Sequence, residues 1–227
     1  DYLRCMQEEN EAEVISKVLY PADDHNEGKS LRLKQQYFLV SASLQNIVND
    51  HKHRYGPLDK LPQYAAIHIN DTHPALAIPE LMRILMDENG FTWDDAWNIT
   101  TATFAYTNHT VMAEALETWQ EDLIARRLPR IYMIIKEINR RFCADLWNRY
   151  PGQHALIEGM SVISNGQIRM ANLSVIGSHK VNGVSALHSD IIKKSVFRDF
   201  YEYTPEKFTN VTNGIAHRRW LNQSNPE

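Results

Sequence analysis

Cysteine is nearly missing from this sequence of 227 residues, which contains two, Cys5 and Cys143. Two thiols form one bridge at most, so the disulfide framework that staples many small secreted domains is excluded. The same scarcity argues against a zinc site built on cysteine thiolates. Low cysteine use fits a reducing compartment, and we expect a cytoplasmic protein.

Long apolar runs are also missing, and none approaches the roughly 20 residues that a membrane span requires. A formal net charge of −4 and a pI of about 6.2 argue against a dedicated nucleic-acid-binding protein. We therefore expect neither membrane nor nucleic acid as a partner. Glycine is scarce at nine residues, and neither the Walker nor the dinucleotide-binding fingerprint occurs, so no glycine-rich phosphate cradle is present.

The composition that remains, 43% hydrophobic and 23% charged, is that of an ordinary globular domain with a substantial core. Apolar residues at helical spacing predict helices over residues 1–19, 30–50, 79–87, 92–99, most of 111–150 and 184–200. Thr92 is expected to cap one helix, and Pro129 to break another. Asn165-Gly166 predicts a hairpin over residues 161–170, and proline and glycine predict a loop over 51–63.

The chain is organised around residues 64–81, where a short apolar run ends in a polar loop and a helix follows. Ile67 and Ile69 predict a buried strand over residues 64–69. In open α/β sheets, ligands bind outside the carboxyl ends of the strands, so Asp71 and His73 are candidate site residues. The alternative is that Asp71 and Thr72 cap a turn while His73 is a surface residue.

The same pattern recurs at three further predicted strands, over residues 103–106, 172–177 and 208–212. Polar residues follow each of them, namely His109, then His179 and Asn182, and finally Asn213. Strands alternating with helices predict an α/β fold with few strands and many helices. Carboxylate, amide and imidazole groups offer directional hydrogen bonds that suit the hydroxyls of a sugar.

Nine motifs extend this pattern along the chain, and together they resemble the glycogen/maltodextrin phosphorylase (α-glucan phosphorylase) family. They are VLYP at 18–21, EGK at 27–29, LRLKQ at 31–35, NDTHPALAIPEL at 70–81, YTNHT at 106–110, EALETW at 114–119, GSHKVNGV at 177–184, TNG at 212–214 and RRWL at 218–221. The motifs are long and keep the order of that family.

The resemblance implies a helix-rich, Rossmann-like part of a two-domain GT-B glycosyltransferase. Members are several times longer, so residues 1–227 are expected to be one segment, the C-terminal half of the N-terminal, glucan-side domain. It implies transfer of terminal α-1,4-glucosyl units of glycogen or maltodextrin to inorganic phosphate, giving glucose 1-phosphate. The parent is expected to be a homodimer that uses pyridoxal phosphate, with the attachment lysine outside this chain and the isolated chain inactive.

Roles for eight residues are implied by the same resemblance. His109 would contact the glucosyl residue at the reaction centre, Asp71 would order that neighbourhood, and Asn213 would bind the 6-hydroxyl. His73, Glu117 and Arg32 would line the adjoining pocket. Asp23 and Asp24 belong to a loop that gates the site, where the family commonly has asparagine at the position of Asp24. A carboxylate accepts from the sugar 2-hydroxyl but cannot donate to it, which leaves that contact open.

Two other classes of function fit the residues. Asp71, His73 and His109 could serve a metal-dependent hydrolase, which would bind zinc or manganese stoichiometrically. The chain could instead be a non-catalytic carbohydrate-binding module, if the parent lacked the cofactor lysine and phosphate-binding residues.

Overall fold

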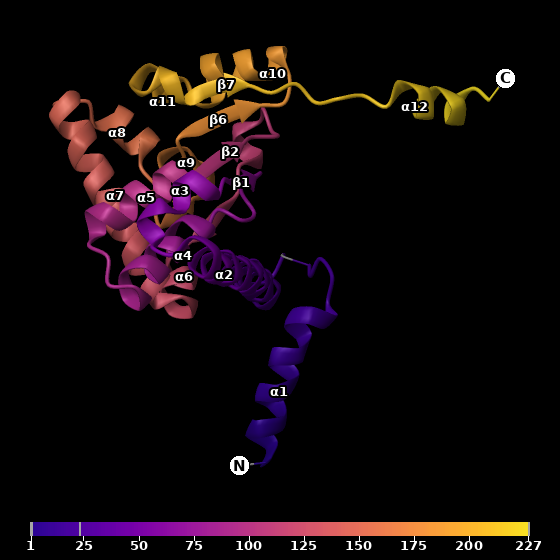
Figure 1. Ribbon diagram of the computed structural model, residues 1–227, viewed down its shortest axis with the longest axis vertical. Coiled ribbons are helices and arrows are strands. Elements are labelled where there is room, and N and C mark those ends of the chain that lie inside the picture. The colour runs from indigo at the N-terminus through magenta and orange to yellow at the C-terminus, as the bar shows by residue number, and fades with distance from the viewer. Residues whose placement is uncertain (1, 23, 227) are drawn as a thin grey trace.

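The structure is a computed structural model that describes residues 2–22 and 24–226 (Figure 1). Its larger sheet has four strands, β1 (Ile67–Asn70), β2 (Phe104–Thr107), β6 (Lys180–Gly183) and β7 (Phe208–Asn210). The strands pair in the order β1-β2-β6-β7, and every pairing is parallel. Their carboxyl ends therefore lie at one edge of the sheet, and the predicted α/β fold with a parallel sheet is confirmed.

A second, smaller sheet is antiparallel and joins β3 (Thr118–Gln120), β5 (Gln167–Arg169) and β4 (Ile163–Ser164), in the order β3-β5-β4. Strands β4 and β5 form the predicted hairpin, and Asn165 and Gly166 have φ values of 50° and 70°. Both values are positive, as a type I′ turn requires. Strand β3 departs from the prediction that most of residues 111–150 are helical, because pairing with β5 holds residues 118–120 extended.

Helices make up most of the remaining chain, and none of those described combines the length and apolar character needed to cross a membrane. The α-helices are α1 (Tyr2–Lys17), α2 (Asn26–Tyr55), α3 (Leu61–Tyr64), α4 (Ala77–Arg83), α5 (Trp93–Thr103), α6 (Glu121–Arg127), α7 (Pro129–Arg149), α8 (His154–Met160), α9 (Met170–Ile176), α10 (Ala186–Ile191), α11 (Arg198–Tyr203) and α12 (His217–Ser224). Short 3-10 turns are η1 (Leu58–Lys60), η3 (Ala113–Ala115) and η5 (Pro205–Lys207), and π-helical turns are η2 (Ile84–Glu88) and η4 (Ile192–Val196).

The core lies around helix α4, which follows directly after the polar loop of β1. Six of its seven residues are buried, and the helix packs against α2, α5 and α7. Strands β1 and β2 contribute Ile69, Phe104 and Tyr106, which are almost fully buried. The polar loop is thus held between a buried strand and a buried helix, which makes it a rigid platform for a site.

Several local predictions are confirmed. Strands β1, β2 and β7 lie within a few residues of the predicted ranges 64–69, 103–106 and 208–212. The Thr92 hydroxyl accepts a hydrogen bond from the amide of Asp95 at 3.2 Å and donates to its carboxylate at 2.7 Å, as a capping residue does. Helix α7 begins at Pro129, where the break was expected.

The prediction of a strand over residues 172–177 is wrong, because this segment belongs to helix α9. All seven residues of α9 are buried, so its apolar run shows neither helical nor strand periodicity. A buried helix and a buried strand look alike in sequence under that condition. The third strand of the sheet is β6. It occupies the segment that was predicted to be the polar loop after the strand over residues 172–177.

Two further element boundaries differ from prediction. Helix α2 continues through residues 51–55, which were predicted to be loop, and ends where Gly56 adopts a φ of 86°. The buried ring of His51 supports this extension by a hydrogen bond to the carbonyl of Pro57 at 3.1 Å. Residues 184–200, predicted to be one helix, form α10 and then a π-helical turn before α11 begins.

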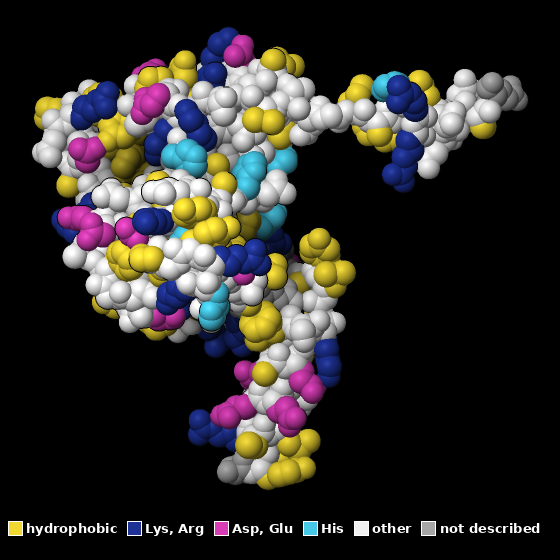
Figure 2. Space-filling view, viewed as in Figure 1, with side chains coloured by type: hydrophobic (Ala, Val, Ile, Leu, Met, Phe, Trp, Pro, Cys, Tyr) yellow, Lys and Arg dark blue, Asp and Glu magenta, His cyan; other side chains and the backbone are white. Residues whose placement is uncertain are grey.

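Two helical arms extend from the body of the molecule (Figure 1). Helix α1 projects away at the N-terminal end, and α12 lies at the end of an extended segment on another side. Neither helix has a buried residue, although both carry apolar side chains. Figure 2 shows these yellow side chains on the surface of both arms.

Candidate functional site

The loop after β1 has a constrained geometry at Asp71. Its φ of 64° lies in the left-handed region, which Asp tolerates better than most residues. The Asp71 amide donates to the carbonyl of Thr107 at 3.0 Å, which ties the loop to strand β2. Its Oδ1 atom accepts from the Thr72 amide at 2.6 Å. This bond goes to the next residue, whereas an Asx turn is closed two residues on, so the turn-capping role of the alternative interpretation stays a prediction. The bond fixes the Asp71 carboxylate beside Thr72.

Glu117 gathers side chains from two segments that are distant from it in sequence, helix α2 and the loop after β1. Its carboxylate is only 13% exposed. Oε1 accepts from Gln36 Nε2 at 3.1 Å and lies 3.6 Å from Arg32 Nη2 on the same helix. Oε2 accepts from the Thr72 hydroxyl at 3.2 Å and lies 3.4 Å from His73 Nδ1. The structure therefore brings Arg32, Thr72 and His73 together around one carboxylate.

These side chains line a cavity of about 500 Å³, which we call the strand-exit cavity. Asp71, His73 and Glu117 face it together with two cations, Lys29 and Arg32. The remaining polar lining consists of Thr72, Thr110, Glu114, Thr118, Gln120 and Gln167. A cavity of this size with donors, acceptors and both signs of charge suits a polyhydroxylated ligand.

His109 lies at the exit of the neighbouring strand, β2. Its ring is exposed, and Nε2 lies 2.6 Å from Oδ1 of Asn70, the last residue of β1. An amide oxygen only accepts, so Nε2 carries the proton in this contact. His109 does not line the strand-exit cavity, but its contact joins the two strand exits.

A polar network runs across the sheet beneath these exits, from exposed His68 to buried Thr107 and Asn182. The Thr107 hydroxyl donates to Asn182 Oδ1 at 2.8 Å and is also hydrogen-bonded to His68 Nε2. Since the hydroxyl proton goes to Asn182, the ring of His68 must donate through Nε2. The backbone amide of Asn108 donates to the backbone carbonyl of Asn182 at 3.0 Å. The network fixes the register of β1, β2 and β6 where the site residues emerge.

Two other predicted residues, Asn213 and Asp24, lie apart from the strand-exit cavity. Asn213 is exposed beyond β7. Its backbone amide donates to the Val184 carbonyl at 3.0 Å. Asp24 is exposed near the start of α2, with Oδ1 3.9 Å from His25 Nε2. Asp23 lies outside the described residues. Among the described contacts of Glu117, neither Asn213 nor Asp24 occurs.

His179 corrects the prediction for the third strand. It was expected at a polar strand exit, but it precedes β6 and its amide donates to the carbonyl of Phe104, the first residue of β2. His179 therefore lies at the amino ends of the strands, opposite the candidate site. The correction follows from the misassigned strand, because β6 begins one residue after His179.

Gln36, His68 and Asn70 complete the site, and the sequence analysis missed them. Gln36 lies four residues after Arg32 on α2, so both face the same side of the helix. This spacing was a usable signal. His68 and Asn70 lie within strand β1, where alternation places both on one face. No sequence signal indicated their partners on neighbouring strands.

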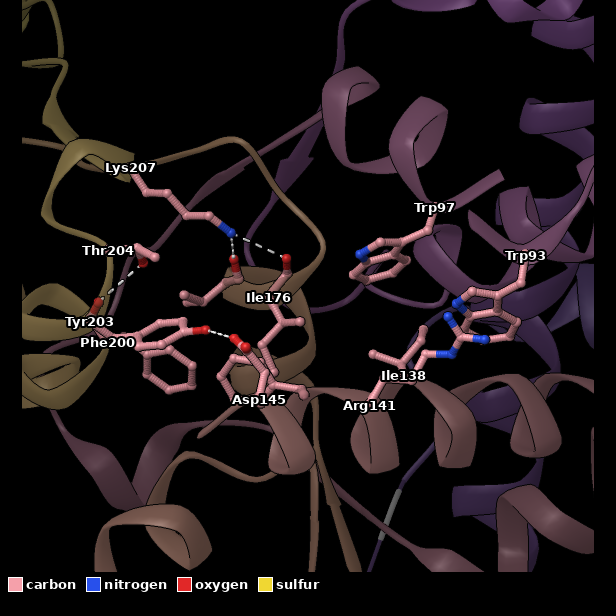
Figure 3. Close-up of a pocket in the computed structure, with 12 residues that line it drawn as sticks. Trp93, Trp97, Ile138, Arg141, Asp145, Ile176, Phe200, Tyr203, Thr204 and Lys207 are labelled. Carbon is pink, nitrogen blue, oxygen red and sulfur yellow. Dashed lines mark hydrogen bonds between the residues drawn. The ribbon is translucent and has the colours of Figure 1, made fainter. Parts of the chain in front are cut away.

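A second cavity, of about 360 Å³, lies among helices α5, α7, α9 and α11 (Figure 3). Trp93, Trp97 and Phe200 give it an aromatic lining. The Lys207 ammonium donates to the carbonyls of Val175 and Ile176, both at 3.2 Å. Burial lowers the pKa of Lys207 to about 8. None of the predicted site residues lines this aromatic cavity.

The residues of the hydrolase alternative are Asp71, His73 and His109. Within residues 2–22 and 24–226, no group of three or more His, Cys, Asp or Glu side chains is placed to hold a metal ion. His73 turns to Glu117 and Arg32, whereas His109 turns to Asn70. The three side chains of that alternative therefore have separate partners.

Comparison with known proteins gives a match over the whole chain. Residues 1–227 match the family model described as carbohydrate phosphorylase. The glycogen phosphorylase of Bacillus subtilis (strain 168) is 55% identical over 216 residues, which cover 95% of this chain and 27% of that protein. The muscle form of glycogen phosphorylase from Ovis aries is 50% identical over 99% of this chain and 28% of that protein. Glycogen phosphorylase 2 of Dictyostelium discoideum is 50% identical over the full chain and 23% of that protein.

The chain thus spans about a quarter of the length of these relatives. Its match extends through every strand of the parallel sheet and through all the loops that carry the candidate site. Taken with the α/β architecture, this coverage shows that the chain belongs to the carbohydrate phosphorylase family.

Proposed function

We propose that the parent protein is an α-glucan phosphorylase that transfers terminal α-1,4-glucosyl units of glycogen or maltodextrin to inorganic phosphate. The product is glucose 1-phosphate. The observation that carries the proposal is the set of hydrogen-bonding side chains at the carboxyl ends of parallel strands, around Glu117 and His109. Membership of the carbohydrate phosphorylase family and the names of the relatives support it.

This chain supplies the sugar side of the site in our proposal. His109 contacts the glucosyl unit, and Asn213 binds its 6-hydroxyl. Asp71 fixes the loop, while Arg32, His73 and Glu117 form the adjoining wall. Positive charge develops on the sugar in the transition state, and fixed dipoles and carboxylates stabilise such charge without reorganisation. The contacts of Asp71 and Glu117 to neighbouring donors provide this fixed placement.

Pyridoxal phosphate completes the site from another part of the parent. Its attachment requires a lysine, and Lys29 is the one lysine among the described residues that line the strand-exit cavity. We assign the attachment lysine to a position outside this chain, and Lys29 and Arg32 to binding anionic groups. When bound, the cofactor supplies a phosphate group that relays a proton to the substrate phosphate.

In this proposal, residues 1–227 are the C-terminal half of a Rossmann-like N-terminal domain in a two-domain GT-B architecture. The sequential strand order β1-β2-β6-β7 fits one half of a doubly wound sheet. A homodimeric, cytoplasmic parent remains a prediction.

The test uses the parent protein at the full length of its relatives, supplied with pyridoxal phosphate. We expect glucose 1-phosphate release from glycogen and phosphate, with the rate falling roughly a hundredfold or more in His109→Ala. Glu117→Gln is expected to lower kcat/KM roughly tenfold, because it removes charge-assisted hydrogen bonds. Glu202→Gln is the control, since this exposed side chain on α11 lies outside the strand-exit cavity and forms a long ion pair with Arg198, at 4.0 Å.

The isolated chain is expected to release no glucose 1-phosphate, because the cofactor side is missing. Release by the pure chain would contradict that expectation. A full-length parent that binds glucan but gives no glucose 1-phosphate would favour the carbohydrate-binding module instead.

A further inference from the structure

His188, on helix α10, joins two segments that support candidate site residues, the loop that carries His109 and the residue Val184, which holds the loop of Asn213. Its ring is buried, with the residue 8% exposed. Nδ1 accepts from the amide of Val184 at 3.1 Å, and Nε2 lies 3.2 Å from the carbonyl of Thr110. Thr110 directly follows His109, and the carbonyl of Val184 accepts from the amide of Asn213. A single imidazole therefore lies between the supports of both residues.

The two contacts fix the protonation of the ring. A backbone amide only donates, so Nδ1 must be unprotonated. A backbone carbonyl only accepts, so Nε2 must carry the proton. The neutral Nε2–H tautomer satisfies both bonds at once, and the two nitrogens are not interchangeable.

The position of the ring is itself fixed by its own helix. The Ser185 hydroxyl accepts from the His188 amide at 3.1 Å and caps the start of α10. Gly183 allows close approach, since a Cβ there would lie 2.6 Å from Ser189 Oγ and 2.8 Å from Ser189 N. Helix α10 is thus seated tightly on the end of β6, and the imidazole has little freedom to move.

The loop that carries His109 is held at both backbone polar groups of Thr110. The Thr110 amide donates to Asn108 Oδ1 at 3.0 Å, and the Thr110 carbonyl faces His188. Asn108 is itself buried at the end of β2. The backbone that carries His109 is therefore held between its own strand and the ring of His188.

The geometry points to His188 as a positioning residue for the glucosyl site, which sets the distance between the loops of His109 and Asn213. This inference rests on the proposed function for the roles of those two residues. His188 need not touch the sugar. It acts through one hydrogen bond to Thr110 in the His109 loop and one to Val184, whose carbonyl in turn holds the Asn213 loop, and the two bonds can be removed separately.

Two substitutions separate the bonds in the full-length parent. In His188→Asn, the side-chain oxygen reaches the former Nδ1 position and keeps the Val184 bond, but no atom reaches Thr110. In His188→Gln, the amide nitrogen reaches the Nε2 position and keeps the Thr110 bond, but Val184 loses its acceptor. His188→Leu removes both. The control is His179→Gln, because His179 lies at the opposite edge of the sheet.

The kinetic test compares glucose 1-phosphate with its 6-deoxy analogue as donors in the direction of glucan synthesis. In His188→Asn we expect kcat to fall roughly tenfold for both donors, because the His109 loop is released. In His188→Gln we expect the preference for the 6-hydroxyl to fall roughly tenfold, because the Asn213 loop is released. Losses that are identical in the two variants, or that match those of His179→Gln, would overturn the assignment.

Amide hydrogen exchange in the same proteins tests the contacts without activity. We expect faster exchange at Val184 and Asn213 in His188→Gln, and in residues 110–112 in His188→Asn. Unchanged exchange in both variants would overturn the inference. If the wild-type parent gives no glucose 1-phosphate while the two variants show these exchange patterns, only the proposed function is contradicted.

Discussion

At the scale of single residues, charge and burial are balanced differently in the two cavities. Glu117 has four neighbouring donors or cations within 3.6 Å, so its carboxylate is compensated on both oxygens. The ammonium of Lys207 donates to two backbone carbonyls (Figure 3), and among residues 2–22 and 24–226 no carboxylate is paired with it. A compensated charge stabilises its surroundings, whereas an ammonium held by carbonyl dipoles retains part of its desolvation cost.

The pH dependence of stability should reveal this cost at Lys207. Burial lowers its pKa to about 8, whereas the pKa of a lysine in the unfolded chain is about 10.4. Between these values the unfolded state binds more protons, so the contribution of Lys207 to stability rises with pH. Below pH 8 both states are protonated, and the cost is fully present.

We expect the wild-type chain to gain up to about 3 kcal/mol relative to Lys207→Met between pH 8 and pH 10.5. Urea denaturation at several pH values measures the difference. Lys194→Met, at an exposed lysine, is the control. A difference between wild type and Lys207→Met that stays constant with pH would show that the ammonium is not desolvated.

At the scale of elements, the sequence predicted best where one face is buried and the other is not. Strand β1, the hairpin and the break at Pro129 each carry a clear period or turn signal. Helix α9 carries none, because all its residues are buried, and its misassignment moved His179 to the wrong edge of the sheet. Strand β3 was missed because it is held extended by pairing with β5, a contact between segments about 50 residues apart in the chain.

The candidate site was predictable to a similar degree. Asp71 and His73 follow from the strand and loop pattern, whereas the roles of Glu117 and Arg32 came from the family resemblance. Their meeting in space depends on where α2 packs beside the β1 loop, which no local pattern encodes. His188 escaped prediction for the same reason, since its partners are main-chain atoms of distant loops.

Gly177 gives a direct test of how α9 packs. A Cβ at this position would lie 2.6 to 2.9 Å from three side-chain atoms of Ile78 on helix α4. We expect Gly177→Ala to destabilise the protein by about 1–3 kcal/mol through overpacking. Adding Ile78→Ala should make the effect of Gly177→Ala much smaller, because it removes the atoms that clash.

A double-mutant cycle by chemical denaturation measures the coupling between these two positions. Gly159→Ala serves as the control, since Gly159 lies within α8 and a Cβ there has no atom within 4 Å. This control should be neutral or stabilising, as alanine favours helix. Additive effects of Gly177→Ala and Ile78→Ala would contradict the predicted clash.

At the scale of the whole molecule, a packed body carries two helical arms, α1 and α12, in which no residue is fully buried (Figure 2). Exposed apolar residues on the arms include Leu3 and Met6 on α1 and Trp220 and Leu221 on α12. Side chains of this kind gather where another surface is to be covered. Because the chain spans about a quarter of its relatives, we propose that other parts of the parent cover both arms.

Limited proteolysis should separate the arms from the body. In the isolated chain we expect chymotrypsin to cut first near Leu19 and Tyr20 and near Trp220, since the local structure there opens at little cost. A fragment close to residues 26–210 should persist. In the full-length parent the same bonds should be cleaved at least roughly tenfold more slowly. Equal rates in both proteins would show that the arms remain uncovered.

The order of the parallel strands has a consequence for biosynthesis. Each strand of the sheet pairs with the one made before it, from β1 to β2, then β6, then β7. A nascent chain can therefore extend the sheet strand by strand as it leaves the ribosome, without waiting for a later strand to insert between two earlier ones. Asn213 follows the last of these strands, so we expect the glucosyl site to be the last feature of the body to mature during translation.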